Sequence, residues 1–385
     1  MTSMGAPQTC DVVVVGAGVF GAWTAYQLCQ AGKSVTLIDG YGAGNSRSSS
    51  GDESRIIRMG YGGDETYSRS AWRSLQLWKE LFAQTGDNLF RKTGVLWLAH
   101  DGDPYPVSSF ETLTNLSFPI EELTLPEVST RYPQFGYEGI GGAFLEAESG
   151  VLLARRAVQS LVREALKSGV EYLQDSVEPP NARRFDEVVT TSGERISAAV
   201  YVFACGAWLP KVFPDVLAGR IHSTRQDVFY LGAPGMRFQS PALPVWIDFK
   251  TEAYGLPDIE GRGVKVAIDR HGEAFDPDTN DRVVSSESLA EVRRYLARRV
   301  PELQNAPVNE TRVCQYENTS NGDFLIDRHP QFENVWLVGG GSGHGFKHGP
   351  FVGEYVTARI EGLTEGIEPR FNLAAKSDEH QRAVY

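Results

Sequence analysis

Glycine residues near the start of the chain have the types and spacing needed to bind a phosphorylated ligand. Gly16, Gly18 and Gly21 form a Gly-x-Gly-x-x-Gly pattern, and Asp39 follows at the end of the next apolar run. The first glycine permits a tight turn, the second lets the backbone approach a pyrophosphate, and the third lets a helix pack closely on a strand. Asp39 can then accept hydrogen bonds from a ribose. The pattern predicts an adenine dinucleotide but does not separate NAD from FAD, and a turn without a ligand is the alternative.

Cationic side chains further along the chain could bind or stabilise anions. Arg55 and Arg58 flank an apolar pair, and their spacing predicts that both lie on one side of a short helix or turn. Lys265 is a charged residue inside an apolar run, where strand alternation places it on the same face as Gly263 and Ala267. The alternative is a lysine on the solvated outer face of a sheet.

The C-terminal part of the chain contains an isolated cysteine and a dense glycine loop. Cys314 is far from the other three cysteines in the sequence. The loop at 339–345 reads GGGSGHG and follows an apolar run, which predicts that its backbone passes close to a planar ligand. Lys347 comes just after this loop. Taken singly, these features also fit a buried free thiol, a flexible loop and a solvated cation.

These motifs, in this order, resemble the FAD-dependent amine oxidases of the monomeric sarcosine oxidase and N-methyltryptophan oxidase family, within the D-amino-acid-oxidase-like superfamily. The resemblance spans nearly the whole chain. Its other matching segments are 92–96 (KTGVL), 148–151 (ESGV), 206–208 (GAW), 313–314 (VC), 324–327 (FLID) and 343–347 (GHGFK).

The resemblance implies an α/β (α+β) fold in two parts. A Rossmann-like FAD-binding domain would comprise residues 1–90, 146–216 and 311–385. A substrate domain built on an antiparallel sheet would comprise residues 91–145 and 217–310. Local patterns agree, with predicted strands at 11–15, 35–38, 199–203 and 335–338 and predicted helices at 22–30 and 156–167.

The resemblance also implies which residues contact FAD. The cofactor-binding residues would be Gly16, Gly18, Gly21, Asp39, Ser49, Cys314, Gly343, His344, Gly345 and Lys347. Cys314 would be joined by a thioether to the 8α carbon of the flavin. His344 would order its loop rather than act as an acid or base.

Further roles follow from the resemblance for the reaction itself. Arg58 and Lys347 would pair with a substrate carboxylate, a contact that suits an arginine fork and an ammonium group. Tyr61 and Tyr254 would line the substrate cavity. Catalytic roles fall to two further residues, Arg55 near the flavin and Lys265 beside its N5 atom. There the charge of the lysine would help oxygen become superoxide.

The chain departs from the family pattern at positions near the expected substrate. Members of the family carry a histidine four positions beyond the lysine, where this chain has Asp269, and histidines at the positions of Ser50, Gly51 and Met59. A carboxylate in that place would favour an additional cation or hydroxyl groups. We therefore expect a substrate larger or more polar than sarcosine, provided that Asp269 faces the cavity.

The expected reaction is oxidation of a secondary amine, an N-substituted α-amino acid of the N-methyl type. A hydride equivalent would pass to the flavin, the imine would hydrolyse to an amine and a carbonyl compound, and oxygen would yield hydrogen peroxide. Within the family, a fructosyl or cyclic amino acid oxidase is the alternative. A flavin dehydrogenase with another acceptor, a nicotinamide-dependent dehydrogenase and a non-catalytic flavin-binding protein are further alternatives.

The composition and charge of the chain limit the kinds of molecule that it is expected to bind. The chain has 385 residues, 49 of them acidic and 37 basic, and its net charge of −12 without a long basic run disfavours nucleic acid. The start of the chain lacks a basic n-region, which predicts a cytoplasmic protein without a signal peptide or membrane span. The seven histidines show no metal-ligand spacing, so no metal is expected. The expected partners are a small amine and oxygen, and the family suggests a monomer.

Overall fold

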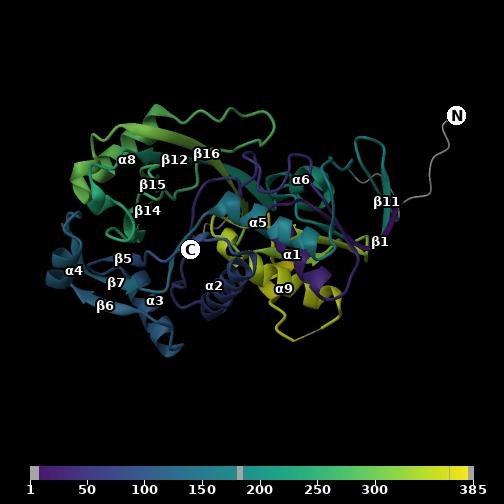
Figure 1. The fold of residues 1–385 in the computed structure, drawn as a ribbon, viewed down its shortest axis with the longest axis horizontal. Helices are drawn as coiled ribbons and strands as arrows, with labels where there is room; N and C mark the ends of the chain where they lie inside the picture. Colours follow the sequence, from purple (N-terminus) through teal and green to yellow (C-terminus); the bar gives the residue numbers. More distant parts are fainter. Residues whose placement is uncertain (1–7, 180–184, 364, 380–385) are drawn as a thin grey trace.

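The computed structural model describes residues 8–179, 185–363 and 365–379, arranged around two large sheets and one small sheet. Figure 1 shows an elongated molecule in which β1 and β11 lie toward one end and β5, β6 and β7 toward the other. The expected absence of a signal peptide concerns residues 1–7, which lie outside the described residues. Within the described residues, no helix is both long and apolar enough to cross a membrane.

A seven-stranded sheet has the order β17-β18-β11-β1-β2-β9, with β10 paired to β11. Its strands are β1 (Gln8–Val15), β2 (Val35–Ile38), β9 (Glu171–Leu173), β10 (Val188–Val189), β11 (Arg195–Phe203), β17 (Leu325–Arg328) and β18 (Val335–Gly339). From β18 to β9 the strands are parallel, whereas β10 and β17 are antiparallel to their partners. Residues 12–15 are buried, as expected for a β-branched run covered on both faces. The four predicted strands are confirmed as parts of β1, β2, β11 and β18.

Helices pack on one side of this sheet, where Figure 1 shows α1, α5 and α9 together. They are α1 (Val19–Gln30), α5 (Ala154–Lys167) and α9 (Gly349–Ile360), and α2 (Glu65–Thr85) packs beside α9. The predicted helix at 22–30 begins earlier, at Val19, because Gly18 is its N-cap. The predicted helix at 156–167 is confirmed as α5. Short helices α6 (Leu209–Val212) and α7 (Pro214–Leu217) follow β11.

An eight-stranded sheet has the order β16-β12-β15-β14-β13-β5-β7-β6. Its strands are β5 (Val95–His100), β6 (Glu121–Thr124), β7 (Ile140–Glu146), β12 (Ile221–Leu231), β13 (Val245–Asp248), β14 (Ala253–Leu256), β15 (Val264–Ile268) and β16 (Val308–Thr319). All neighbouring pairs are antiparallel except β13 with β5. The helices of this region are α3 (Pro104–Asn115), α4 (Leu125–Arg131) and α8 (Ser286–Arg299). The predicted combination of a parallel and an antiparallel sheet, and so the fold class, is confirmed.

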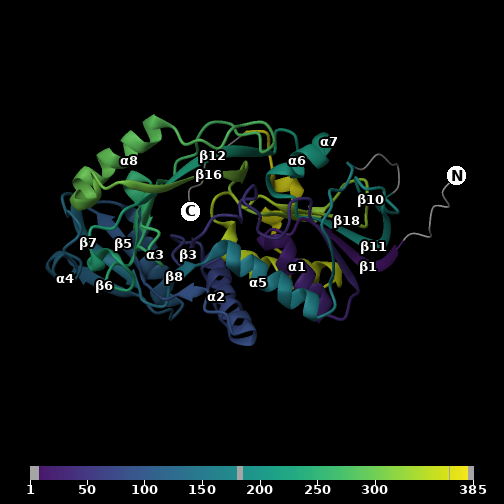
Figure 2. The same ribbon diagram turned by 45° about the horizontal axis from the view of Figure 1, so that its top comes forward.

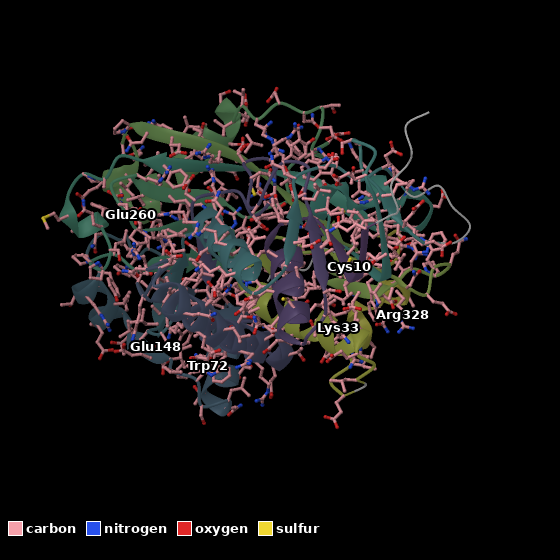
Figure 3. The ribbon with its side chains drawn as sticks, turned by 45° about the vertical axis from the view of Figure 1, so that its right-hand side comes forward. Cys10, Lys33, Trp72, Glu148, Glu260 and Arg328 are labelled. Atoms are coloured by element: carbon pink, nitrogen blue, oxygen red, sulfur yellow. The ribbon has the colours of Figure 1, made fainter. Side chains whose placement is uncertain are left out.

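The long strand β16 connects the two ends of the molecule. It pairs with β12 along nearly its whole length, and Figure 2 shows both strands running from α8 toward α6. Figure 3 places Cys10 and Arg328, from the seven-stranded sheet, at the end opposite Glu260, from the loop after β14. β16 crosses position 310/311, where the predicted division between the two domains falls, and that division stays a prediction.

A small sheet of β3 (Arg55–Ile57), β8 (Gly150–Leu152) and β4 (Phe90–Arg91) lies between the large sheets. The prediction of a short helix or turn carrying Arg55 and Arg58 is therefore wrong. Residues 55–57 are extended because they pair with β8, a partner almost a hundred positions away. Spacing within one segment does not reveal such pairing.

Candidate active site

The larger of two adjoining cavities extends from the glycine turn after β1 to the glycine loop after β18. Predicted cofactor-binding residues that line it are Gly16, Gly18, Asp39, Ser49, Cys314, Gly343 and Gly345. Strand β16 contributes Cys314, and the segments around β1 and β18 contribute the glycines. Residues that lie far apart in the sequence therefore surround one space.

The glycine turn has the shape that the sequence predicts. Gly16 has φ +107°, and a Cβ atom there would lie 2.3 Å from the carbonyl oxygen of Ala204. A Cβ atom on Gly21 would lie 1.9 Å from the carbonyl oxygen of Gly16. Neither position accepts a side chain, so Gly16 permits the turn and Gly21 permits close packing of α1 on the strand. The turn brings the N-terminus of α1 to the cavity, where the helix dipole favours anions, and the Val19 N–H donates to the Ser50 hydroxyl at 3.0 Å.

Asp39 lies at the end of β2 and lines the same cavity. Its Oδ2 atom accepts a hydrogen bond from the Ala17 N–H at 2.7 Å, and Oδ1 accepts from the N–H groups of Tyr41 and Gly42. Burial raises the pKa of Asp39, and the three N–H groups oppose that shift. The carboxylate therefore orders the loop after β2 as well as facing the cavity.

Cys314 and Arg55 meet where the two cavities join. The Arg55 Nη2 atom lies 3.1 Å from the Cys314 sulfur and also donates to the Ser49 carbonyl oxygen at 2.8 Å. Although burial opposes the shift, the Cys314 sulfur and the Asp52 carboxylate raise the pKa of Arg55. All four cysteines, which are within the described residues, are free thiols. A guanidinium beside a sulfur stabilises negative charge on it.

The smaller cavity lies on the other side of this junction and collects the predicted cations. The predicted site residues that line it are Arg55, Arg58, Tyr254, Lys265, Asp269, Cys314, Gly343, His344 and Lys347. Both cavities are lined by Arg55, Cys314, Tyr316, Gly343 and Phe346. A ligand in the larger cavity and one in the smaller cavity would therefore be in contact.

Arg58 and Lys347 are buried basic side chains in the smaller cavity. The Arg58 guanidinium lies over the rings of Tyr61 and Trp97, at 4.6 and 4.9 Å from their centroids. Lys347 Nζ donates to the Tyr61 hydroxyl at 2.7 Å and to the His344 carbonyl oxygen at 2.9 Å. Burial, and then the charge of Arg58, hold the pKa of Lys347 well below its usual range. This arrangement suits an incoming carboxylate.

The structure places Tyr61 one layer behind the smaller cavity instead of among the residues that line it. Besides Lys347, its hydroxyl contacts His348 Nε2 at 2.6 Å, and His348 Nδ1 contacts the Ser70 hydroxyl at 2.5 Å. Burial holds the pKa of His348 well below its usual range, so the ring is neutral and can accept from Tyr61. Tyr61 therefore supports Lys347 from behind.

Lys265 is almost completely buried and faces the smaller cavity, so the alternative of a solvated outer face does not hold. Its Nζ atom donates to Asp52 Oδ2 at 2.5 Å and to the Ser54 carbonyl oxygen at 2.8 Å. Sequence reasoning missed Asp52. A polar loop gives no sign that one of its two adjacent acidic residues turns inward.

Asp269 lines the smaller cavity, as the hypothesis of a more polar substrate requires. Its Oδ1 atom accepts a hydrogen bond from the Tyr316 hydroxyl at 2.6 Å. Burial, and then the nearby Asp269 carboxylate, raise the pKa of Tyr316. Sequence reasoning also missed Tyr316, although alternate residues on a strand share a face and Cys314 had already been singled out.

Two buried glutamates complete the site and were not predicted. Glu146 accepts hydrogen bonds from the N–H groups of Met59 and Gly60, at 2.7 and 2.9 Å, and from the Trp97 indole. It thereby holds the backbone that follows Arg58. Glu317 lines the larger cavity, and its Oε2 atom has no hydrogen-bond partner among the described residues. Burial raises the pKa of Glu317 to about 7.

Comparison with known proteins agrees with this architecture. A profile of the family described as "DAO: FAD dependent oxidoreductase" matches residues 11–359. Monomeric sarcosine oxidase from Arthrobacter sp. strain TE1826 is 30% identical over 366 residues, which cover 92% of this chain and 93% of that protein. N-methyl-L-tryptophan oxidase from Yersinia pestis strain Pestoides F is 28% identical over 353 residues, which cover 89% of this chain and 93% of that protein.

A solved structure of an oxidoreductase has a similar fold over nearly the whole chain. L-proline dehydrogenase from P. horikoshii has a TM-score of 0.82 and 25% identity, with 96% of this chain and 98% of that chain covered. The family profile and the similar sequences confirm the resemblance predicted from the motifs, and FAD is the cofactor of the matching family. The chain belongs to the DAO family of FAD-dependent oxidoreductases.

Proposed function

We propose that the protein is an FAD-dependent oxidase of secondary amines that acts on N-substituted α-amino acids of the N-methyl type. The observation that carries this proposal is the convergence of Arg58, Lys347 and Lys265 on one buried cavity that adjoins the dinucleotide cavity at Cys314. The similarity to monomeric sarcosine oxidase and N-methyl-L-tryptophan oxidase supports the same reaction class.

The described residues fit FAD. The glycine turn and the α1 N-terminus would hold the pyrophosphate, and Asp39 would receive the ribose. A Cβ atom on Gly343 would lie 2.7 Å from the Tyr316 ring, and one on Gly345 would lie 2.9 Å from the Phe20 ring. Glycine at both positions lets the loop pack directly against these two rings while its backbone lines the larger cavity. When bound, FAD supplies the acceptor for the hydride of the amine substrate.

Arg58 and Lys347 would hold the substrate carboxylate. Burial and the charge of Arg58 lower the pKa of Lys347, and a bound anion opposes both effects, so it favours the ammonium form of Lys347. Tyr61 and His344 orient the lysine. Holding the carboxylate at two points would leave the amine carbon free to reach Cys314 and Tyr316, which line both cavities.

Cys314 is proposed as the point of covalent flavin attachment. The nearby Arg55 guanidinium would stabilise negative charge that develops on the sulfur during attachment. Precipitation of the protein with acid tests this, because a tethered yellow chromophore stays in the pellet and a dissociable one stays in solution. A colourless pellet would contradict the proposal.

Lys265 is proposed to serve the reaction with oxygen. A buried ammonium group stabilises negative charge that develops nearby, and little solvent screens it. Lys265→Met is expected to slow reoxidation by oxygen far more than reduction by the amine. Equal effects on both half-reactions would reject this role.

The polar lining around Asp269 supports a substrate larger or more polar than sarcosine. A carboxylate at the cavity wall attracts a cationic or hydroxylated substituent and gives a small methyl group no matching contact. A panel of N-methyl amino acids with apolar, hydroxylated and cationic side chains would rank the substituents. Preference for the apolar members would contradict this proposal.

We further propose that oxygen is the acceptor and that the protein is a cytoplasmic monomer. Four free cysteines suit a reducing compartment, and one relative is named as monomeric. Light scattering measures the oligomeric state directly.

The decisive experiment mixes the purified yellow protein with N-methyl amino acids under anaerobic conditions and follows flavin absorbance. Bleaching by the amine, followed by recovery and stoichiometric hydrogen peroxide on admission of oxygen, is expected. Bleaching without peroxide would contradict the choice of oxygen as acceptor. No bleaching with any secondary amine would contradict the proposed substrate class.

A further inference from the structure

We infer that Asp52 is a positioning residue for the oxygen reaction, holding Lys265 as an ammonium ion at a fixed point beside the junction of the two cavities. The inference rests on the proposed function. The contact that carries it is the 2.5 Å separation between Lys265 Nζ and Asp52 Oδ2, with both side chains buried. The Ser54 carbonyl oxygen, 2.8 Å away, fixes the ammonium group from a second direction.

Asp52 is itself held rigidly. Its Oδ2 atom also accepts from Arg55 Nη1, while Oδ1 accepts from the Tyr230 hydroxyl at 3.0 Å and from the Glu53 N–H at 2.7 Å. Although burial opposes the shift, the charges of Lys265 and Arg55 hold the pKa of Asp52 well below its usual range. The carboxylate therefore stays ionised and cannot rotate away from the lysine.

Other groups around Lys265 cannot replace this carboxylate. The titratable groups around the lysine are Asp52 from the loop before β3, Arg55 on β3, Tyr230 on β12 and Cys314 on β16, and Tyr254 on β14 lines the same cavity. Burial, helped by the charge of Arg55, lowers the pKa of Lys265, whereas the Asp52 carboxylate and, after it, the Cys314 sulfur oppose that shift. Removing the charge of Asp52 would leave the buried lysine beside the Arg55 guanidinium without a carboxylate, so Lys265 would lose its proton.

The adjacent acid provides a matched control. Glu53 points the other way, toward Arg155 and Arg262, with ion-pair distances of 2.9 and 3.2 Å. Asp52→Asn and Glu53→Gln each remove one negative charge from the same loop. Any effect of net charge or loop composition would appear in both variants, and an effect on Lys265 would appear only in Asp52→Asn.

The test measures reoxidation of the bound flavin by oxygen across a pH series, after photochemical reduction so that no amine substrate is needed. The rate for the wild-type protein and Glu53→Gln should vary little with pH. In Asp52→Asn the rate should fall by about tenfold for each pH unit above the new pKa of Lys265. Flavin absorbance of Asp52→Asn should show a matching titration that is absent from Asp52→Asn/Lys265→Met.

A second pair of variants separates charge from position. Arginine keeps its charge without a carboxylate partner, so Asp52→Asn/Lys265→Arg should show a flat pH profile again. Asp52→Glu should keep the flat profile but react more slowly, because its carboxylate is displaced by one methylene. This variant preserves the test if Asp52→Asn does not fold.

Several results would contradict a positioning role for Asp52. A flat profile at the wild-type rate in Asp52→Asn would overturn it, as would a wild-type rate in Asp52→Glu. Equal slowing of flavin reduction by the amine and of flavin reoxidation by oxygen, at every pH, would show that Asp52 has only a structural role. Because the reoxidation assay omits the amine, failure of the proposed substrate class would appear in a different experiment.

Discussion

Arg55 Nη2 lies 3.1 Å from the sulfur of Cys314, a residue 259 positions further along the chain. This contact joins the small sheet to β16 at the place where the two cavities meet. The same guanidinium contacts the Asp52 carboxylate. One arginine thus links the proposed attachment point of the cofactor to the charged group beside Lys265.

Arg55→Ala is predicted to abolish covalent flavin attachment while leaving bound flavin that acid releases. Without the guanidinium, the Cys314 sulfur loses the nearby cation that would stabilise negative charge developing on it during attachment, so the reaction slows. Fluorescence of the protein band after denaturing electrophoresis measures the attachment. Cys314→Ser is the control that must lack the attachment in any case, and normal tethering in Arg55→Ala would refute the role of the contact.

Binding of a carboxylate is predicted to draw a proton onto Lys347. The pKa of Lys347 is lowered in the free protein, and a bound anion raises it. Affinity for a carboxylate is therefore highest at pH values below the pKa that Lys347 has in the free protein. As pH rises between the free and bound values, affinity should fall by about tenfold per pH unit. Calorimetry of acetate binding in buffers of different ionisation enthalpy measures the uptake. Lys347→Met should bind more weakly and without proton uptake, and uptake that persisted in this variant would assign the proton elsewhere.

Glu146→Gln is predicted to raise KM more than it lowers kcat. One carboxylate oxygen becomes an NH2 group, which cannot accept, so either the Met59 N–H or the Gly60 N–H loses its acceptor at a cost of about 1–3 kcal/mol. Steady-state kinetics with the best amine of the panel would measure both constants. Glu148→Gln, which removes a partly exposed carboxylate that pairs with Lys79 and Lys92, should leave KM unchanged.

Asp248→Asn is predicted to destabilise the protein without changing the site. Asp248 is fully buried between His100, at 2.8 Å, and Arg299, at 2.9 Å. Removing the carboxylate leaves a buried guanidinium without its counter-ion, which costs about 3–5 kcal/mol. Denaturant unfolding measures the loss. Glu121→Gln, which breaks an exposed pair with Arg131, should cost below about 1 kcal/mol, and similar losses in both variants would contradict the prediction.

The elements nearest the start of the chain could be predicted because their causes are local. A β-branched run, a glycine turn and a helix follow one another within the first thirty residues, and each depends on its own backbone preferences. The prediction for the β3 segment was wrong because its conformation depends on a distant partner. Its extended form depends on pairing with β8, and Tyr61 lies behind the cavity because packing against His348 decides its direction.

By itself, the sequence determined the dinucleotide turn, the order of the family motifs and the identities of the cations that serve the site. Tertiary structure decided which charges meet. Asp52 and Glu53 are neighbours with similar side chains, yet Asp52 is buried against Lys265 and Glu53 pairs with the partly exposed Arg155 and Arg262. The physical reason is that the state of a buried charge depends on groups brought close by folding, and those groups come from positions hundreds of residues apart.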